Sequence, residues 1–184
     1  VHRLDEPTSG LMMVALTKPA QTALKDLLAD HNIERRYLAI VSGGFPEAPM
    51  TIRNTLVENR GDRKRGSGPG GKPATTHFRL VEAVGRRCSL VEAQLETGRT
   101  HQVRIHLSEA GFPVLGDRVY APPGVSAVGP RLALHAWRLG LKHPMTGEQL
   151  RLEAPLADDL EHLRRDLVAG QRSAVPRRNR QKRR

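Results

Sequence analysis

Two long segments with alternating apolar residues, 74–84 and 86–96, are separated only by Gly85. Alternation with a period of two is typical of half-buried strands, and a glycine between two such segments favours a tight reversal. We therefore predict a long β-hairpin. A second hairpin is predicted for 131–142 and 149–153, around a Thr-Gly pair. Because hairpins recur, the sheet is expected to be largely antiparallel.

Helices are predicted to be few. Thr17 is a suitable N-cap for a helix from Lys18 to about Asp30. Two further helices are expected over 101–110, ending at Gly111, and over about 157–168. A buried strand is expected at 11–16 and a further strand at 33–41. Strands dominate, so the predicted class is α+β with a mixed, largely antiparallel sheet and a few flanking helices.

The chain carries an excess of positive charge. Its 184 residues include 30 Lys and Arg against 19 Asp and Glu, a formal net charge of +11. Such an excess favours a polyanionic partner such as nucleic acid. Seven of the basic residues lie within 171–184, which has no acidic residue, so the remainder carries 11 − 7 = +4. We predict one domain over 1–168 and a disordered basic tail over 169–184, which either binds RNA or promotes solubility.

A second basic segment is internal. Between Glu58 and Pro73 the composition shifts to Gly, Ser, Lys and Arg, and a mobile basic loop is predicted there. Its glycines are too irregular for a nucleotide-binding motif. Within it, Arg63, Lys64 and Arg65 are candidate RNA-binding residues.

Cysteine content and hydropathy bear on the compartment. The single cysteine, Cys88, has no partner for an internal disulfide and is expected to be a buried thiol in a reducing cytosol. No apolar run reaches the roughly 20 residues of a membrane span, and no signal peptide is visible. We expect a cytoplasmic protein that is a monomer and makes no membrane contact.

Three blocks of sequence stand out. Residues 2–11 read HRLDEPTSGL; 95–107 read LETGRTHQVRIHL, and GFPVLGD and Tyr120 follow; RLALHA begins at Arg131. The first block alone would be read as a turn. In this order, however, the three resemble the motifs of the RluA-type RNA pseudouridine synthases. The resemblance covers 1 to about 160 and implies the pseudouridine synthase fold, built around a central cleft.

The resemblance also implies an activity. Members of this family isomerise specific uridines of structured RNA to pseudouridine, so RNA is the expected partner. Ribosomal RNA is favoured, and a tRNA-directed enzyme is an alternative. The isomerisation is redox-neutral, so no cofactor and no metal are expected. Family members carry a segment before the first motif, whereas this sequence begins at Val1. We therefore expect an N-terminally incomplete catalytic domain, and a noncatalytic RNA-binding fragment is a second alternative.

The motifs assign roles to individual residues. By resemblance, Asp5 is the catalytic aspartate, acting as nucleophile or base. Tyr37 is expected to stack on the extruded uracil, and Arg104 to keep the Asp5 carboxylate ionised. Four further residues are candidate RNA contacts. Arg3 is expected at a phosphate or in the space that the flipped base leaves, with a surface salt bridge as an equal alternative, and Arg99 is expected at a phosphate. The other two are His101 and Gln102, for which capping or packing is an equal alternative.

A rival interpretation uses the histidines. A metal-dependent phosphoesterase would need ligands from a set comprising His2, Asp5, His101, His106 and His135. The spacing of His101 and His106 places their rings on different faces of the predicted helix, unlike the i, i+4 pair of zinc proteases. We therefore expect structural roles for His2 and His135.

Overall fold

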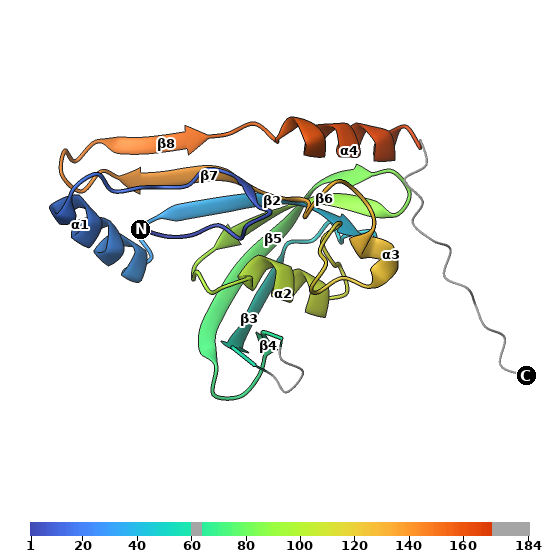
Figure 1. Ribbon diagram of the computed structural model, residues 1–184, viewed down its shortest axis with the longest axis horizontal. Helices are drawn as coiled ribbons and strands as arrows, with labels where there is room; N and C mark the ends of the chain where they lie inside the picture. The colour runs from blue at the N-terminus through green and yellow to red at the C-terminus, as the bar shows by residue number, and fades with distance from the viewer. Residues whose placement is uncertain (60–63, 171–184) are drawn as a thin grey trace, which may run out of the picture.

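The computed structural model describes residues 1–59 and 64–170, whose strands form one eight-stranded sheet with four helices around it (Figure 1). The strands are β1 (Ser9–Gly10), β2 (Glu34–Ser42), β3 (Met50–Val57), β4 (Gly66–Ser67), β5 (Lys72–Val84), β6 (Cys88–Leu95), β7 (Leu134–Lys142) and β8 (Gln149–Glu153). The helices are α1 (Lys18–Ala29), α2 (Gln102–Glu109), α3 (Pro123–Ser126) and α4 (Asp158–Val168).

The sheet runs in the order β1-β7-β2-β6-β5-β3-β4. β8 pairs with the C-terminal part of β7, beyond the two residues that pair with β1. Every pairing is antiparallel except that of β1 with β7. Helices α1 and α4 lie near opposite ends of the molecule, and α2 contacts β5 (Figure 1). The predicted class, α+β with a mixed, largely antiparallel sheet, is confirmed.

The predicted hairpin forms the centre of the sheet. β5 and β6 pair over most of their length and turn at Gly85, whose φ is +65°. A side chain on Gly85 would collide with the backbone oxygen of Leu167 in α4. A glycine is therefore required both by the turn and by the approach of α4.

The core follows β2 and β6. Both strands are buried along nearly their whole length, so side chains on both of their faces are covered. Cys88 is buried at the start of β6, as predicted. In the middle of β6, Glu92 is 2% exposed and binds arginines from both neighbouring strands, Arg36 at 2.8 Å and Arg79 at 2.8 and 2.9 Å.

The first helix begins as predicted. The Thr17 hydroxyl accepts a hydrogen bond from the amide of Ala20 at 3.3 Å, which satisfies one of the free amides of the first turn. Among the helices of the described residues, none is long and apolar enough to cross a membrane.

The buried strand predicted at 11–16 is wrong. Only β1, just before it, pairs with the sheet, while Met12, Val14 and Leu16 are exposed. The alternate residues Leu11 and Met13 do pack, against the cluster around Leu24 and Leu139. The segment 11–16 is therefore covered on one face only, and its apolar composition does not reveal this.

Other elements were missed by the sequence interpretation. β3 alternates between half-buried and exposed positions, but its polar residues hid the pattern. β4 and the start of β5 lie inside the segment predicted as a mobile loop. Residues 60–63 and 171–184, which include Arg63 and nearly all of the predicted basic tail, lie outside the described residues.

Candidate active site

A cavity of about 540 Å³ opens between the N-terminal segment, β2 and the loop that leads into α2. It brings together the three residues predicted to be catalytic, Asp5, Tyr37 and Arg104. Four of the predicted RNA-binding residues also line it: Arg3, Arg99, His101 and Gln102. The motifs 2–11 and 95–107, far apart in the sequence, thus meet at one cavity.

Asp5 is positioned by a turn and a short parallel strand. Its carbonyl oxygen accepts a hydrogen bond from the Thr8 amide at 2.8 Å, and β1 then pairs with β7. Gly10 has a φ of +104°, and a side chain there would collide with the carbonyl oxygen of Ala136. Ala136 is also the partner of Tyr37 on the other side of β7. β7 therefore sets the position of the Asp5 segment relative to Tyr37.

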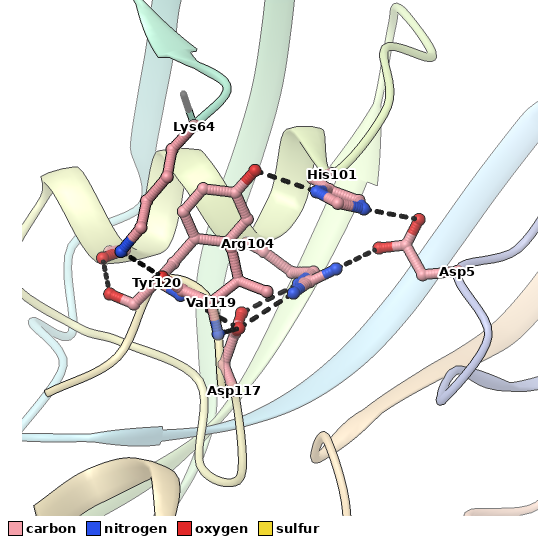
Figure 2. Close-up of polar contacts among 8 residues, drawn as sticks. Asp5, Lys64, His101, Arg104, Asp117, Val119 and Tyr120 are labelled. Carbon is pink, nitrogen blue, oxygen red and sulfur yellow. Dashed lines mark hydrogen bonds and ion pairs between the residues drawn. The ribbon is translucent and has the colours of Figure 1, made fainter. Parts of the chain in front are cut away.

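Arg104 joins Asp5 to a second carboxylate (Figure 2). It lies in α2 and is 5% exposed. Its Nη1 donates to Asp5 Oδ2 at 2.9 Å, while its Nε and Nη2 donate to the two oxygens of Asp117 at 2.8 and 2.9 Å. Burial works to lower the pKa of Arg104, but the bonds and charges of Asp117 and Asp5 outweigh it and raise that pKa. The guanidinium is therefore a permanent cation beside Asp5.

Asp117 ends the GFPVLGD motif, and its role is visible only in the structure. It is 1% exposed, and the amides of Val119 and Tyr120 donate to its Oδ1 at 2.9 and 3.1 Å (Figure 2). Burial alone would raise the pKa of Asp117, but the bonds from Arg104 and these amides bring it below its ordinary value. Asp117 thus fixes the plane of the Arg104 guanidinium and leaves Nη1 directed at Asp5.

His101 and Tyr120 lie beside the ion pairs (Figure 2). The His101 Nδ1 and the Tyr120 hydroxyl are hydrogen-bonded at 2.8 Å, and the Arg104 guanidinium lies 5.1 Å from the centre of the Tyr120 ring. Burial, then the charge of Arg104, lower the pKa of His101 below its ordinary value of 6.5, so the ring is neutral near neutral pH. Its 3.7 Å contact with Asp5 is then no ion pair. Burial raises the pKa of Tyr120 to about 12.

Tyr37 and Arg35 both reach the cavity from β2. The register of β2 against β7 shifts between Arg36 and Tyr37, and such irregularities redirect side chains. Burial raises the pKa of Tyr37, Arg35 lowers it and Asp5 raises it further, so the hydroxyl is protonated at neutral pH. Arg35 lines the same cavity and is 7% exposed. The sequence analysis did not single it out, because burial of one arginine in a basic run leaves no signal.

The predicted RNA-binding residues differ in their surroundings. Arg3 and Arg99 are exposed at the cavity. Gln102 is buried; its amide donates to the Thr75 carbonyl and to Thr76, and its oxygen accepts from Thr97 and from the Arg99 amide. These contacts match the packing alternative for Gln102, while its RNA contact stays a prediction.

The basic segment contributes to a neighbouring groove. A second cavity of about 520 Å³ shares Arg99 with the first and is also lined by Arg65 and Lys72. Arg65 binds Glu58 at 3.2 Å. Lys64 donates to the Val119 carbonyl at 3.0 Å (Figure 2) and so connects this segment to the Asp117 loop. The two cavities together form a continuous surface with basic residues.

The histidines of the rival interpretation do not gather. His2 accepts from the Met13 amide, His106 contacts Thr76 and Asn54, and His135 contacts Ser9 and the Ala154 carbonyl. Among residues 1–59 and 64–170, no group of three or more His, Cys, Asp or Glu side chains is arranged to hold a metal ion.

Comparisons with known proteins agree with this geometry. The chain is 42% identical over 175 residues to Ribosomal large subunit pseudouridine synthase D of Neisseria meningitidis serogroup A, covering 89% of this chain and 46% of the relative. It is 41% identical over 185 residues to the protein of the same name from Zymomonas mobilis, covering 94% and 57%. The chain thus spans about half the length of the curated relatives it matches.

The fold is also similar to a solved structure, Human RNA Pseudouridylate Synthase Domain Containing 1. The TM-score is 0.73 and the identity 29%, with 91% of this chain and 79% of that chain covered. The family model for RNA pseudouridylate synthase matches residues 1–109. Motifs, fold and matches therefore agree that the chain belongs to the RNA pseudouridylate synthase family, in the RluA-type group that its motifs resemble.

Proposed function

We propose that the protein converts uridines of structured RNA, in the first place ribosomal RNA, into pseudouridine, with Asp5 as the catalytic carboxylate. The observation that carries this proposal is the Asp5 carboxylate, held at 2.9 Å by the buried Arg104 in a cavity that Tyr37 also lines. Ribosomal RNA is favoured because similar proteins are named as synthases of the large ribosomal subunit. We propose a cytoplasmic location, because ribosomal RNA is the favoured substrate.

The reaction breaks the bond between ribose C1′ and uracil N1, turns the base and joins C1′ to C5. The C5 proton is lost and N1 gains a proton, so the product is an isomer of the substrate. A carboxylate serves this reaction as nucleophile at the sugar or as base. Arg104 binds and orients the Asp5 carboxylate. The Tyr37 ring, which lines the same cavity, is proposed to stack on the uracil. We propose that neither a metal ion nor a redox cofactor takes part, because the isomerisation is redox-neutral.

The target uridine must leave its stack before it reaches Asp5, at a cost of a few kcal/mol. Arg3 and Arg99 are exposed at the cavity, where they can bind phosphates of the displaced strand. Lys64 and Arg65 extend this basic surface towards the second cavity. Arg63, which lies outside the described residues, is proposed as a further RNA contact. We propose that the protein acts as a monomer, since Asp5, Tyr37 and Arg104 line one cavity within a single chain.

The test is tritium release from RNA that carries [5-³H]uridine, because C5 loses its hydrogen when it bonds to C1′. Release with the unmodified protein, undiminished by exhaustive chelation on prefolded RNA, supports the proposal. Binding without release would favour a noncatalytic RNA-binding protein. Parallel assays with ribosomal RNA and tRNA decide between the two substrate classes, and the asparagine variant of Asp5 is the control for contaminating activity.

A further inference from the structure

In the described part of the chain, four charged side chains are 7% exposed or less, and they differ in whether an opposite charge lies beside them. Glu92 binds two arginines, and Arg104 and Asp117 bind each other. Arg35 has no carboxylate within ion-pair distance among the described residues. One of the cavity's two buried cations is therefore unpaired.

The contacts of Arg35 leave most of its donor capacity unused. Its Nη2 donates to the Glu96 carbonyl at 3.2 Å, and its Nε has no partner although it is buried. Its Nη1 lies against Gly98, where a side chain would collide with it. Gly98 lies in the loop that precedes α2, and both residues line the cavity. A guanidinium has five N–H donors, so several remain for a ligand.

Burial without a counter-charge is costly for a cation. Burial lowers the pKa of Arg35, and the ionisable groups near it are His2 and Tyr37, neither of which is an anion at neutral pH. A protein that needed only the packing of this side chain would be more stable with an apolar residue of similar length. An unpaired buried charge at a cavity wall therefore points to a role in binding or chemistry.

We propose that Arg35 is a catalytic residue that binds the uracil oxygens and stabilises the negative charge on the base when the C1′–N1 bond breaks. The inference rests on the proposed function. The bonding electron pair passes to N1 and is shared with the carbonyl oxygens, to which Arg35 donates. When C1′ bonds to C5, the C5 proton leaves to a base and N1 is protonated, so no further reactant is needed.

The base is a better ligand for Arg35 than an RNA phosphate. Arg35 is buried and lies two residues before Tyr37, which is proposed to stack on the uracil, and both line the same cavity. Arg3 and Arg99, in contrast, are exposed, and exposed arginines suit phosphates that remain near solvent. Donors that meet charge only as it develops increase the rate of the chemical step more than the affinity.

The test compares Arg35→Met with Arg36→Met, both in the full chain. Arg36 is the next residue of β2 and does not line the cavity; its partner Glu92 keeps Arg79 when Arg36 is replaced. The RNA carries either uridine or 5-fluorouridine at the target position. Single-turnover rates are measured by nuclease digestion and mass spectrometry, and RNA affinity is measured by filter binding. Fluorine at C5 stabilises negative charge on the detached ring, so it reduces the need for Arg35. Because fluorine cannot leave C5 as a proton does, the C5-linked product of this substrate keeps fluorine and takes up water at C6, and the rate for 5-fluorouridine is the rate at which this product forms.

For uridine, we expect Arg35→Met to lower the single-turnover rate by about 10²-fold or more, as for loss of an oxyanion donor, with RNA affinity unchanged. For 5-fluorouridine the loss should be at least several fold smaller. Arg36→Met should behave as wild type on both substrates. The melting temperature of Arg35→Met should equal or exceed that of wild type, because an unpaired buried charge is removed.

Four results would overturn the proposal. The first is an equal loss of rate on both substrates, and the second is a normal rate with uridine. The third is a loss of RNA affinity alone, which would assign Arg35 to a phosphate. The fourth is a lower melting temperature or failure to fold, which would make Arg35 structural. Absence of turnover in the wild-type protein is a separate result, because it removes the proposed function itself.

Discussion

Two buried arginines line the same cavity and have opposite surroundings. Arg104 makes three hydrogen bonds to the carboxylates of Asp5 and Asp117, whereas Arg35 makes one bond, to a backbone carbonyl. Arg104 neutralises charges that exist in the resting protein. Arg35 retains donors for a charge that the substrate brings. The difference predicts that replacing Arg104 destabilises the protein whereas replacing Arg35 does not, although both residues serve the chemistry.

The largest effect is expected at the carboxylate itself. Asp5→Asn should abolish pseudouridine formation, since an amide is neither a nucleophile nor a base, and leave RNA affinity nearly unchanged because a carboxylate does not attract a polyanion. Tritium release and filter binding measure the two quantities. A variant that kept about a tenth of normal turnover would remove Asp5 from its proposed role.

Arg104→Lys should be severely impaired in turnover. An ammonium group cannot make the two-pronged contact with Asp117 and also reach Asp5. Near-normal turnover in this variant would shift the role to Arg99.

Stability separates the two arginines directly. Arg104→Met leaves Asp117 buried without its cation, and removal of one partner from a buried pair costs about 3–5 kcal/mol of unfolding free energy. Arg35→Met should not lower the free energy of unfolding. Urea unfolding of both variants measures the difference, and equal losses would end the distinction between them.

Asp117→Asn should have a smaller effect, which depends on pH. The pKa of Asp117 is lowered in the folded protein, so its contribution is present above its unfolded value of about 3.8 and is lost as the pH falls through the folded value. Wild type should therefore lose stability more steeply than the variant below about pH 4. Parallel acid-unfolding curves would contradict this account. Turnover should also fall, because Arg104 loses its fixed orientation.

The smallest effect is expected at an exposed arginine of the same cavity. Arg99→Ala should weaken RNA binding and reduce the slope of log affinity against log salt by about 0.7 to 0.9, the value for one phosphate contact. The single-turnover rate at saturating protein should not change. An altered rate with an unaltered salt slope would place Arg99 with the buried arginines instead.

Sequence alone predicted the local elements well. Gly85 marked the central hairpin and Thr17 marked the start of α1, because turns and caps depend on a few neighbouring residues. The buried strand predicted at 11–16 was wrong, because apolar composition does not reveal how many faces of a segment are covered. β3 was missed since its alternation includes polar residues on both faces.

The candidate site divides in the same way. The motifs identified Asp5, Tyr37 and Arg104, and the structure places all three at one cavity. The bidentate contact of Asp117 depends on how the loop after α2 folds back, which no spacing rule predicts. The unpaired state of Arg35 is also a tertiary property, since it depends on Gly98 and Glu96 from another part of the chain.

The anchoring of the Asp5 segment has a consequence for local unfolding. Its regular pairing with the sheet is the two-residue β1, reinforced by Arg131, which donates to the Pro7 carbonyl at 3.0 Å and to the Ser9 hydroxyl at 2.9 Å. Segments with so few backbone bonds detach at a free energy below that of global unfolding. The fraction of molecules with Asp5 in place is then an equilibrium of its own. Arg131 lies outside the cavity lining, so we expect a change there to lower that fraction, and with it the concentration of competent enzyme, while the chemistry of each competent molecule stays intact.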